Sequence, residues 1–285
     1  MFDITEDKAK DIVRGFAIPA QPEILKSLQT ENQREYPDIS LISDIISQDV
    51  GLSAYLLKTI NSPTFGLNRS VSDVKQAAMF LGLKALYNIV SFYELRSKFR
   101  QKNSAISLER FWDGSVESAK MCSLAVKHLN LASNCPVEYA YTIGLFHDCG
   151  IAAMATRFSD YKEILQAINK NEGQVFTHLE EAHYKTNHAT VGYFVLSSWN
   201  MPDLICDFTA RHHDPELFSD AKTDKLQRDL FAILKITDNV LARHHRGVND
   251  TEWVLYEDKI LDYFGLSADD YFEIEENLLD DFLTS

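Results

Sequence analysis

Turn-forming residues are scarce in this sequence. It has only 11 glycines and 7 prolines among 285 residues, about half the share that these two residues usually have. A turn-rich, all-β fold needs many such residues, so the composition argues against it. Long helices are the expected alternative.

Long hydrophobic runs and targeting signals are also missing. No apolar run approaches the roughly 20 residues that a membrane-spanning helix needs. Residues 1–7 have neither the basic start nor the apolar core of a secretory signal. We therefore expect a cytoplasmic chain without a membrane partner. The cysteines form no C-x-x-C pair and are expected to be reduced core residues: Cys122, Cys135, Cys149 and Cys206.

Positive charge is in short supply, and the net charge is −14. Residues 1–110 carry 14 basic and 13 acidic side chains, whereas residues 111–285 carry 14 and 29. Residues 250–285 alone hold 12 acids and one base. Such a field repels nucleic-acid phosphates, so a nucleic-acid partner is not expected. The acidic tail fits either a solvated terminal helix or a surface for a partner.

Helical periodicity runs through nearly the whole chain and predicts an all-α fold. The polar residues 103–107 suggest a linker between two packed helical lobes, an N-terminal lobe of residues 1–102 and a second lobe of residues 108–285 with acidic C-terminal helices. A capping box is expected where Thr177 precedes Glu180, and Ser267 with Asp270 is expected to open a final acidic helix. The expected helices are 5–16, 22–32, 41–46, 50–61, 70–81, 83–99, 108–130, 136–156, 159–170, 178–199, 203–213, 225–245 and one from 267.

The pair His147-Asp148 lies inside an apolar helical stretch. An imidazole and a carboxylate in an apolar wall are costly unless they are paired or bind a ligand. Neighbouring side chains on a helix point about 100° apart and can converge on one ion between them. A buried histidine hydrogen-bonded to a carboxylate explains the pair equally well.

Further imidazoles and a carboxylate extend this set. His188 follows Asn187, the pair His212-His213 ends a predicted helix, and Asp238 lies on an apolar helical stripe. A mixture of imidazoles and carboxylates suits iron, manganese, zinc or nickel better than calcium. The other histidines lack apolar neighbours and are interpreted as surface residues: His128, His178, His183, His244 and His245.

The order His-Asp, His, His-His, Asp resembles the HD superfamily of metal-dependent phosphohydrolases. The fuller resemblance is to its HDOD branch, the HD-related output domain of bacterial signalling proteins, and it covers about residues 12–215. The stretches that carry it are residues 16–25, 45–52, 57–63, 77–83, 144–150 (Gly-Leu-Phe-His-Asp-Cys-Gly), 199–202 (Trp-Asn-Met-Pro) and 212–215 (His-His-Asp-Pro).

The resemblance implies an HD-like helical core in the second lobe, which forms one module with the first. It also implies a metal site of six residues: His147, Asp148, His188, His212, His213 and Asp238. Three departures make that site partial. Gly114 stands where the superfamily has its first metal-binding histidine, Ile151 stands where catalytic relatives often have lysine, and the Gly-Tyr-Pro loop of cyclic-di-GMP phosphodiesterases is absent. A divalent transition metal would bind weakly there.

Two functions remain open at this point. The first is a bacterial signal-transduction output module that binds a signalling protein or a small ligand, with little or no catalysis. The second is a metal-dependent phosphohydrolase acting on a nucleotide or another phosphate ester, in which Asp148 would be catalytic. Phosphate would then need a nearby positive charge, and the sequence offers Arg211, beside the paired histidines, and Lys235, on the same helix face as Asp238.

Overall fold

The computed structural model describes residues 15–16, 18–67, 69–99 and 103–284. Within these residues every regular element is a helix and none is a strand, which confirms the all-α prediction. Among the same residues, no helix is long and apolar enough to cross a membrane. The predicted helix at 5–16 lies almost entirely outside the described residues.

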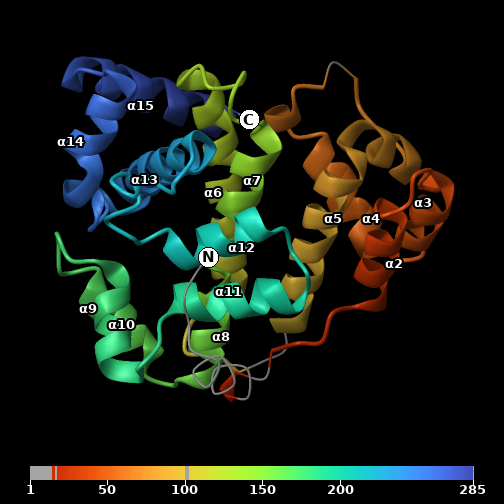
Figure 1. Ribbon diagram of the computed structural model, residues 1–285, viewed down its shortest axis with the longest axis horizontal. Coiled ribbons are helices and arrows are strands. Elements are labelled where there is room, and N and C mark those ends of the chain that lie inside the picture. Colours follow the sequence, from red (N-terminus) through yellow and green to blue (C-terminus); the bar gives the residue numbers. More distant parts are fainter. Residues whose placement is uncertain (1–14, 17, 68, 100–102, 285) are drawn as a thin grey trace. The chain divides into compact units, whose positions relative to one another are not determined.

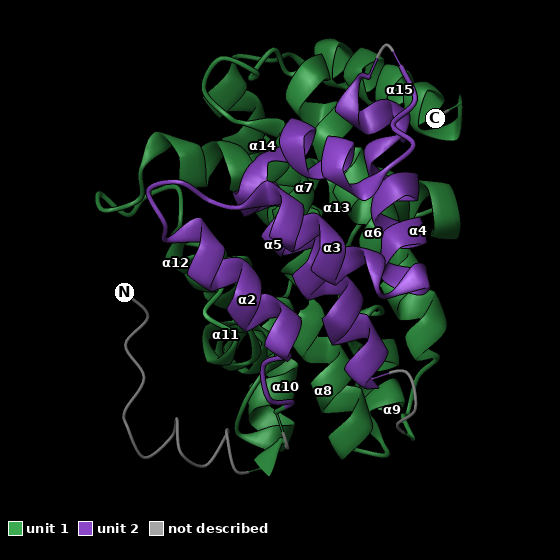
Figure 2. Ribbon diagram, turned by 90° about the vertical axis from the view of Figure 1, so that its right-hand side faces the viewer, with its two compact units in different colours: residues 1–18, 102–284 green, residues 19–101, 285 purple. Residues whose placement is uncertain are grey.

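The chain divides into two compact units, which Figure 2 colours separately. The smaller unit comprises residues 19–101, and the larger comprises residues 102–284 together with residues 1–18. The division after residue 101 falls just before the polar stretch 103–107. Residues 15, 16 and 18, which the sequence assigned to the first lobe, belong to the larger unit: the ring of Phe16 packs edge-on against Phe158, 5.9 Å between centroids.

The smaller unit is built around its last helix, α5, against which α2, α3 and α4 pack. Aspartates cap two of these helices: Asp38 accepts from the backbone N–H of Leu41, and Asp49 from that of Leu52. The elements are α2 (Glu23–Asn32), α3 (Ile39–Ser47), α4 (Val50–Ile60), the 3-10 turn η1 (Pro63–Phe65) and α5 (Val74–Phe99).

Gly82 interrupts α5. Its backbone has φ 73° and ψ 165°, a conformation that is essentially restricted to glycine. The helical ladder therefore breaks there, at the residue that the sequence predicted as a helix end. The preceding segment is capped by Asp73, whose Oδ1 accepts from the Gln76 N–H at 2.8 Å.

The larger unit surrounds α6, which packs against α7, α13 and α15 (Figure 1). The four cysteines are free and buried, as predicted, and all lie in this unit. Its helices are α6 (Leu108–His128), α7 (Val137–Phe146), α8 (Cys149–Arg157), α9 (Tyr161–Ile168), α10 (Phe176–Tyr184), α11 (His188–Ser198), α12 (Asp203–Arg211), α13 (Lys225–Arg246), α14 (Trp253–Phe264) and α15 (Ala268–Thr284).

Two predicted helices are each split in two. The segment 136–156 breaks at His147 and Asp148, which lie between α7 and α8. The segment 178–199 breaks at residues 185–187, where Lys185 has a left-handed φ of 63° and Asn187 caps α11. Both breaks put a candidate metal ligand at a helix end.

The capping box predicted at Thr177 is wrong. Thr177 and Glu180 both lie within α10, which starts at Phe176. The side chain of Glu180 is fully buried and bonds to His188 instead. The predicted start of the last helix at Ser267 is confirmed, because α15 begins at Ala268. Ser267 Oγ accepts from the Asp270 N–H at 3.2 Å, and Asp270 accepts from the Ser267 N–H at 2.9 Å.

Helices α8 and α11 approach each other unusually closely at Gly150. A Cβ atom at this position would lie 2.0 Å from the carbonyl oxygen of His188 and 2.6 Å from the nitrogen of Gly192. Only glycine permits this backbone contact. The contact brings the first residue of α11, His188, next to the start of α8, where Asp148 lies.

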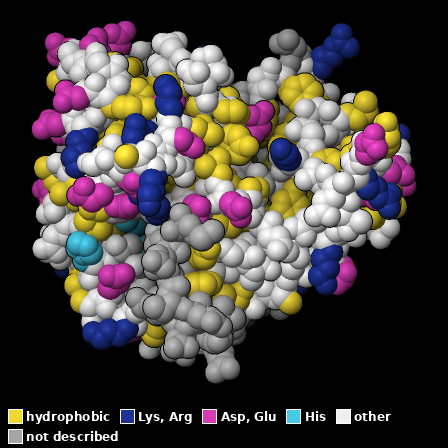
Figure 3. Space-filling model, viewed as in Figure 1, with side chains coloured by type: hydrophobic (Ala, Val, Ile, Leu, Met, Phe, Trp, Pro, Cys, Tyr) yellow, Lys and Arg dark blue, Asp and Glu magenta, His cyan; other side chains and the backbone are white. Residues whose placement is uncertain are grey.

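The acidic tail is folded as α14 and α15, and Figure 3 shows acidic side chains over this part of the surface. Not all of its acids are solvated. Glu252, just before α14, is 1% exposed and forms an ion pair with Lys235. Glu275 on α15 is paired with Arg243 at 2.7 Å. The tail thus contributes buried carboxylates to the larger unit.

Candidate metal centre

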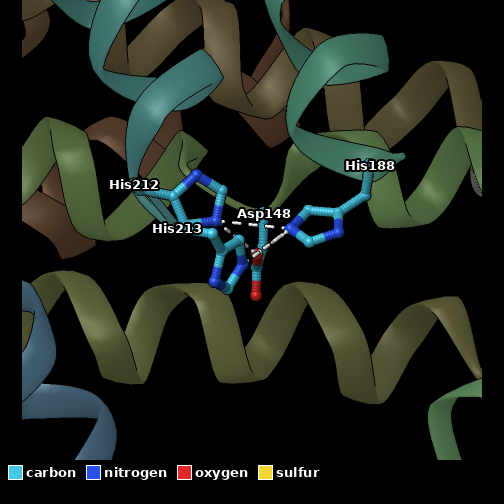
Figure 4. A group of neighbouring side chains, drawn as sticks. All are labelled: Asp148, His188, His212 and His213. Atoms are coloured by element: carbon cyan, nitrogen blue, oxygen red, sulfur yellow. Dashed lines mark hydrogen bonds and ion pairs between the residues drawn. The ribbon is translucent and has the colours of Figure 1, made fainter. Parts of the chain in front are cut away.

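Four potential ligand side chains meet at the ends of three helices (Figure 4). Asp148 immediately precedes α8, His188 begins α11, and His212 and His213 follow α12. Figure 4 shows the three imidazole rings turned toward the carboxylate of Asp148. One ligand atom from each of the four residues lies within 4.8 Å of the others.

The atoms that converge are three Nε2 nitrogens and one carboxylate oxygen. Asp148 Oδ1 lies 3.2 Å from His188 Nε2 and 3.3 Å from His212 Nε2. His188 Nε2 in turn lies 3.3 Å from His212 Nε2 and 3.1 Å from His213 Nε2. The residues are separated by up to 65 positions in sequence, so the fold alone brings them together.

The opposite nitrogen of each ring is held by an acceptor. His188 Nδ1 lies 2.8 Å from Glu180 Oε2, and His213 Nδ1 lies 2.7 Å from Glu252 Oε2. His212 Nδ1 donates to the carbonyl oxygen of Thr209 at 2.7 Å. These partners place a proton on each Nδ1 and direct each Nε2 at the common point, the arrangement found around metal-bound histidines.

The two supporting carboxylates are themselves fixed by hydrogen bonds. Glu180 accepts from the hydroxyl of Tyr161 and from the His188 N–H. Glu252 accepts from Lys235 Nζ at 2.6 Å and from the Phe176 N–H at 2.7 Å. Neither carboxylate reaches solvent, so the imidazoles are oriented by a rigid, buried frame.

Charge in the cluster is concentrated on Asp148 and His188. Burial alone would raise the pKa of Asp148, but the adjacent His147 and hydrogen bonds from the imidazoles hold it well below its ordinary value. Burial alone would lower the pKa of His188, but Glu180 and Asp148 outweigh it and raise that pKa to about 10. Without a metal ion, His188 therefore carries a proton on each nitrogen.

His212 and His213 are neutral. Burial lowers the pKa of both rings. The neighbouring His213 lowers the pKa of His212 further. Glu252 raises the pKa of His213, but by less than burial lowers it. Their Nε2 lone pairs and Asp148 Oδ1 all face the single Nε2 proton of His188. One proton cannot satisfy three acceptors, whereas one cation at this point can bind all of them once that proton leaves.

The donor set fits a divalent transition metal. Three imidazole nitrogens and one carboxylate oxygen are ligands that zinc, iron, manganese and nickel accept. Asp148, His188, His212 and His213 would hold the ion. Such an ion would supply acidification of a bound water and attraction for phosphoryl oxygens.

His147 and Asp238 lie beside this group. His147 Nε2 is 3.3 Å from the other carboxylate oxygen of Asp148, and its Nδ1 donates to the Ile143 carbonyl at 3.1 Å. Burial raises the pKa of Asp238 to about 7, although the positive charges of His147 and Lys235 oppose the shift. Both residues line the same cavity as Asp148.

That cavity has a volume of about 400 Å³ and lies between α6, α13 and the segments that carry Asn169, Phe176 and Asp250. Gly114 of α6 is part of its wall, and a Cβ atom at Gly114 would meet nothing within 4 Å. The open space thus lies where the sequence placed a missing ligand.

The two cations predicted to bind phosphate differ in position. Arg211 does not line the cavity, and its guanidinium is bonded to Asp214 at 2.8 Å and Asp220 at 3.1 Å. Lys235 does line it, but is buried against Glu252. The cavity instead presents Arg110 and Arg246.

Several supporting residues were missed in the sequence. Glu180 was interpreted as a capping residue and Glu252 as part of a solvated tail. A signal for Glu180 was present, since a carboxylate eight positions before His188, in an amphipathic segment, can meet it after a turn. Glu252 lies 39 positions after His213, and no local pattern connects the two.

Comparison with known proteins agrees with this architecture. The family model of the HDOD domain matches residues 18–215. An HDOD domain protein of unknown function from Geobacter sulfurreducens superposes with a TM-score of 0.60 at 20% identity, covering 96% of this chain and 98% of that one. A candidate phosphohydrolase from Shewanella amazonensis gives 0.66 at 20% identity, covering 94% and 93%.

Two curated relatives match over part of their length. An uncharacterized protein of Treponema pallidum is 25% identical over 199 residues, which is 69% of this chain and 38% of that protein. The cyclic di-GMP phosphodiesterase CdgJ of Vibrio cholerae is 23% identical over 167 residues, 56% of this chain and 37% of CdgJ. This chain therefore spans less than half the length of these relatives. With a family model matching well over half of its residues, the chain belongs to the HDOD domain family.

Proposed function

We propose that this chain is a signalling module of HDOD type whose centre holds one divalent transition ion on Asp148, His188, His212 and His213. Occupancy of the centre is relayed to a separate signalling protein. The observation that carries the proposal is the set of three imidazoles whose Nδ1 atoms are engaged and whose Nε2 atoms face one point. Hydrogen bonding alone does not account for three Nε2 nitrogens that are directed at one another.

We favour metal binding over efficient catalysis as the role of this centre because of two features that the cavity lacks. Gly114 supplies no ligand beside His147 and Asp238, so any ion on that side has fewer protein ligands. Lys235, the nearest buried cation, is engaged by Glu252 and does not offer a free ammonium to a phosphate. These features support a role in which the bound ion anchors a ligand or stabilises one conformation of the protein.

Metal analysis of the purified protein tests the proposal. We expect about one equivalent of manganese, iron or zinc in titrations of the full chain. His188→Gln and His212→Gln should each weaken binding at least tenfold, because each removes one ligand. His183→Gln is the matched control, since His183 is an exposed imidazole bonded to Asp160. Equal binding by the His188 and His183 variants would place the ion elsewhere and contradict the proposal.

A second candidate function is metal-dependent phosphate-ester hydrolysis, and Asp238 is the observation that favours it. A carboxylate with a pKa of about 7 in the cavity of Asp148 is suited to exchange protons near neutral pH. Asp148 would then act in catalysis as well. A screen of phosphomonoesters and phosphodiesters with metal-loaded protein tests this. Activity that Asp238→Asn abolishes while metal binding persists would establish it, and inactivity on every ester would exclude it for those substrates.

A further inference from the structure

The cavity is larger than an ion requires. Its volume of about 400 Å³ falls within the range of small-molecule sites. Its wall includes Asp148, His212 and His213 of the metal centre, while Phe111 and Leu241 contribute apolar surface from α6 and α13. A ligand with an apolar body can therefore lie between these two helices while one end of it approaches the metal centre.

Two guanidinium groups line the cavity. Arg110 of α6 is exposed and has no ion pair or hydrogen bond through its side chain to another described residue. Arg246 of α13 is 37% exposed, bonds to the amide oxygen of Asn169 and lies 3.4 Å from Asp250. Arg110 can bind an incoming anion directly. Arg246 is more exposed than Lys235, and its contact with Asp250 at 3.4 Å is longer than the Lys235–Glu252 contact at 2.6 Å.

The permanently charged groups of the cavity nevertheless give it no excess of positive charge. Its carboxylates outnumber its permanent cations by five to three: Glu117, Asp148, Asp238, Asp250 and Glu252 against Arg110, Lys235 and Arg246. An anion entering this space therefore gains no net attraction unless further positive charge is present. A divalent ion beside Asp148 supplies two charges and reverses the balance.

We propose that Arg110 and Arg246 form a subsite for a small phosphate ester or phosphonate that carries an apolar group. This proposal rests on the metal centre proposed above, because the ion must be bound first. A phosphate group offers at least three oxygens, enough for the ion and for both guanidiniums, whereas a carboxylate offers two. The apolar group packs against Phe111 and Leu241.

Phenylphosphonate is the probe of choice, because its carbon–phosphorus bond resists hydrolysis. Calorimetric titration of the full chain, with Mn²⁺ bound and with EDTA, measures its affinity. We expect binding in the presence of Mn²⁺ that weakens at least tenfold in EDTA. Benzyl alcohol, which lacks the anion, should not bind, and benzoate should bind more weakly than phenylphosphonate.

Arginine variants locate the subsite. Arg110→Gln and Arg246→Gln should each weaken phenylphosphonate binding about tenfold or more, the usual effect of losing a charge-assisted hydrogen bond. Arg211→Gln is the matched control, because Arg211 lies beside His212 in sequence but outside the cavity. Mn²⁺ affinity without phenylphosphonate should stay within about threefold of wild type in all three variants.

The remaining outcomes of these titrations show which part of the proposal fails. If Mn²⁺ binds at the centre but phenylphosphonate does not, the subsite is refuted and the metal centre stands. Tighter binding of benzoate, or equal binding in EDTA, overturns the proposed ligand class or its dependence on the ion. If Arg211→Gln weakens binding as much as Arg110→Gln, the subsite lies elsewhere. Failure of the wild type to bind Mn²⁺, Fe²⁺ or Zn²⁺ refutes the proposed function itself.

Discussion

Gly114 is the residue at which we propose that this centre is incomplete. It lies inside α6, where glycine costs about 0.5–1 kcal/mol relative to alanine. The structure gives no packing reason for this cost, because the space around a Cβ atom is open. The position faces a cavity that also contains His147, Asp148 and Asp238. We propose that a metal ligand was lost at this position.

Gly114→His should restore that ligand. The imidazole would enter open space beside His147 and Asp148, so we expect the variant to bind a transition ion at least ten times more tightly, a gain of about 1.4 kcal/mol. Competition titration with a divalent-metal indicator measures the change. Gly114→Ala is the control that separates helix stabilisation from ligation. If the histidine variant folds normally and binds no better than the alanine variant, Gly114 is not a vacant ligand position.

At the scale of helices, the contact between α8 and α11 determines the geometry of the centre. Asp148 precedes one of these helices and His188 begins the other. The two backbones touch at Gly150, so a small displacement of α11 moves His188 Nε2 away from Asp148. Ligand distances at metal sites tolerate only a few tenths of an ångström.

Gly150→Ala tests this coupling between helix packing and ligation. The added methyl group would overlap backbone atoms of His188 and Gly192, which cannot rotate away. We expect a loss of about 1–3 kcal/mol in the free energy of unfolding, as overpacking usually costs, and metal binding at least tenfold weaker. Denaturant unfolding and metal titration measure the two effects. Unchanged metal affinity in this variant would show that α11 does not need this contact to position His188.

The helices also show which parts of the fold could be predicted from the sequence. Periodicity predicted an all-α chain, and resemblance to a known family identified the residues that the fold brings together around Asp148. The break at residues 147–148 was missed because apolar residues continue on both sides of it. The break at residues 185–187 falls in a polar run, Lys185-Thr186-Asn187, which the prediction of one helix over 178–199 included. Lys185 has a left-handed backbone, and because this residue is not a glycine, the sequence does not indicate the turn.

The supporting shell of the centre could not be predicted for a different reason. Glu252 reaches His213 only because the chain folds α13 and the start of α14 back onto the centre. The residues before it, Asn249, Asp250 and Thr251, are polar, whereas apolar residues follow it from Trp253. Local composition therefore does not show whether this carboxylate is buried or exposed. Burial of such a carboxylate becomes favourable only through Lys235, His213 and the Phe176 N–H together, which is a tertiary property.

At the scale of the whole molecule, folding is linked to protons through the centre. In the metal-free protein, the pKa of His188 is about 10, compared with an ordinary value of 6.5. A group whose pKa is raised on folding stabilises the folded state fully below its unfolded pKa. That contribution disappears as the pH rises through the folded pKa. His188 should therefore stabilise the metal-free protein at pH 6 and progressively less from pH 6.5 to 10.

Unfolding in denaturant with EDTA, at pH 6, 7.5 and 9, measures this dependence. We expect the free energy of unfolding of the wild type to fall toward pH 9, by up to about 1.4 kcal/mol for each pH unit above 6.5. His188→Gln has no titrating ring at this position, so its stability should fall less over the same range. The informative quantity is the difference between the two proteins, because groups outside the centre titrate equally in both. A difference that stays constant from pH 6 to 9 would mean that His188 is not held protonated by Glu180 and Asp148, and the electrostatic description of the centre would be wrong.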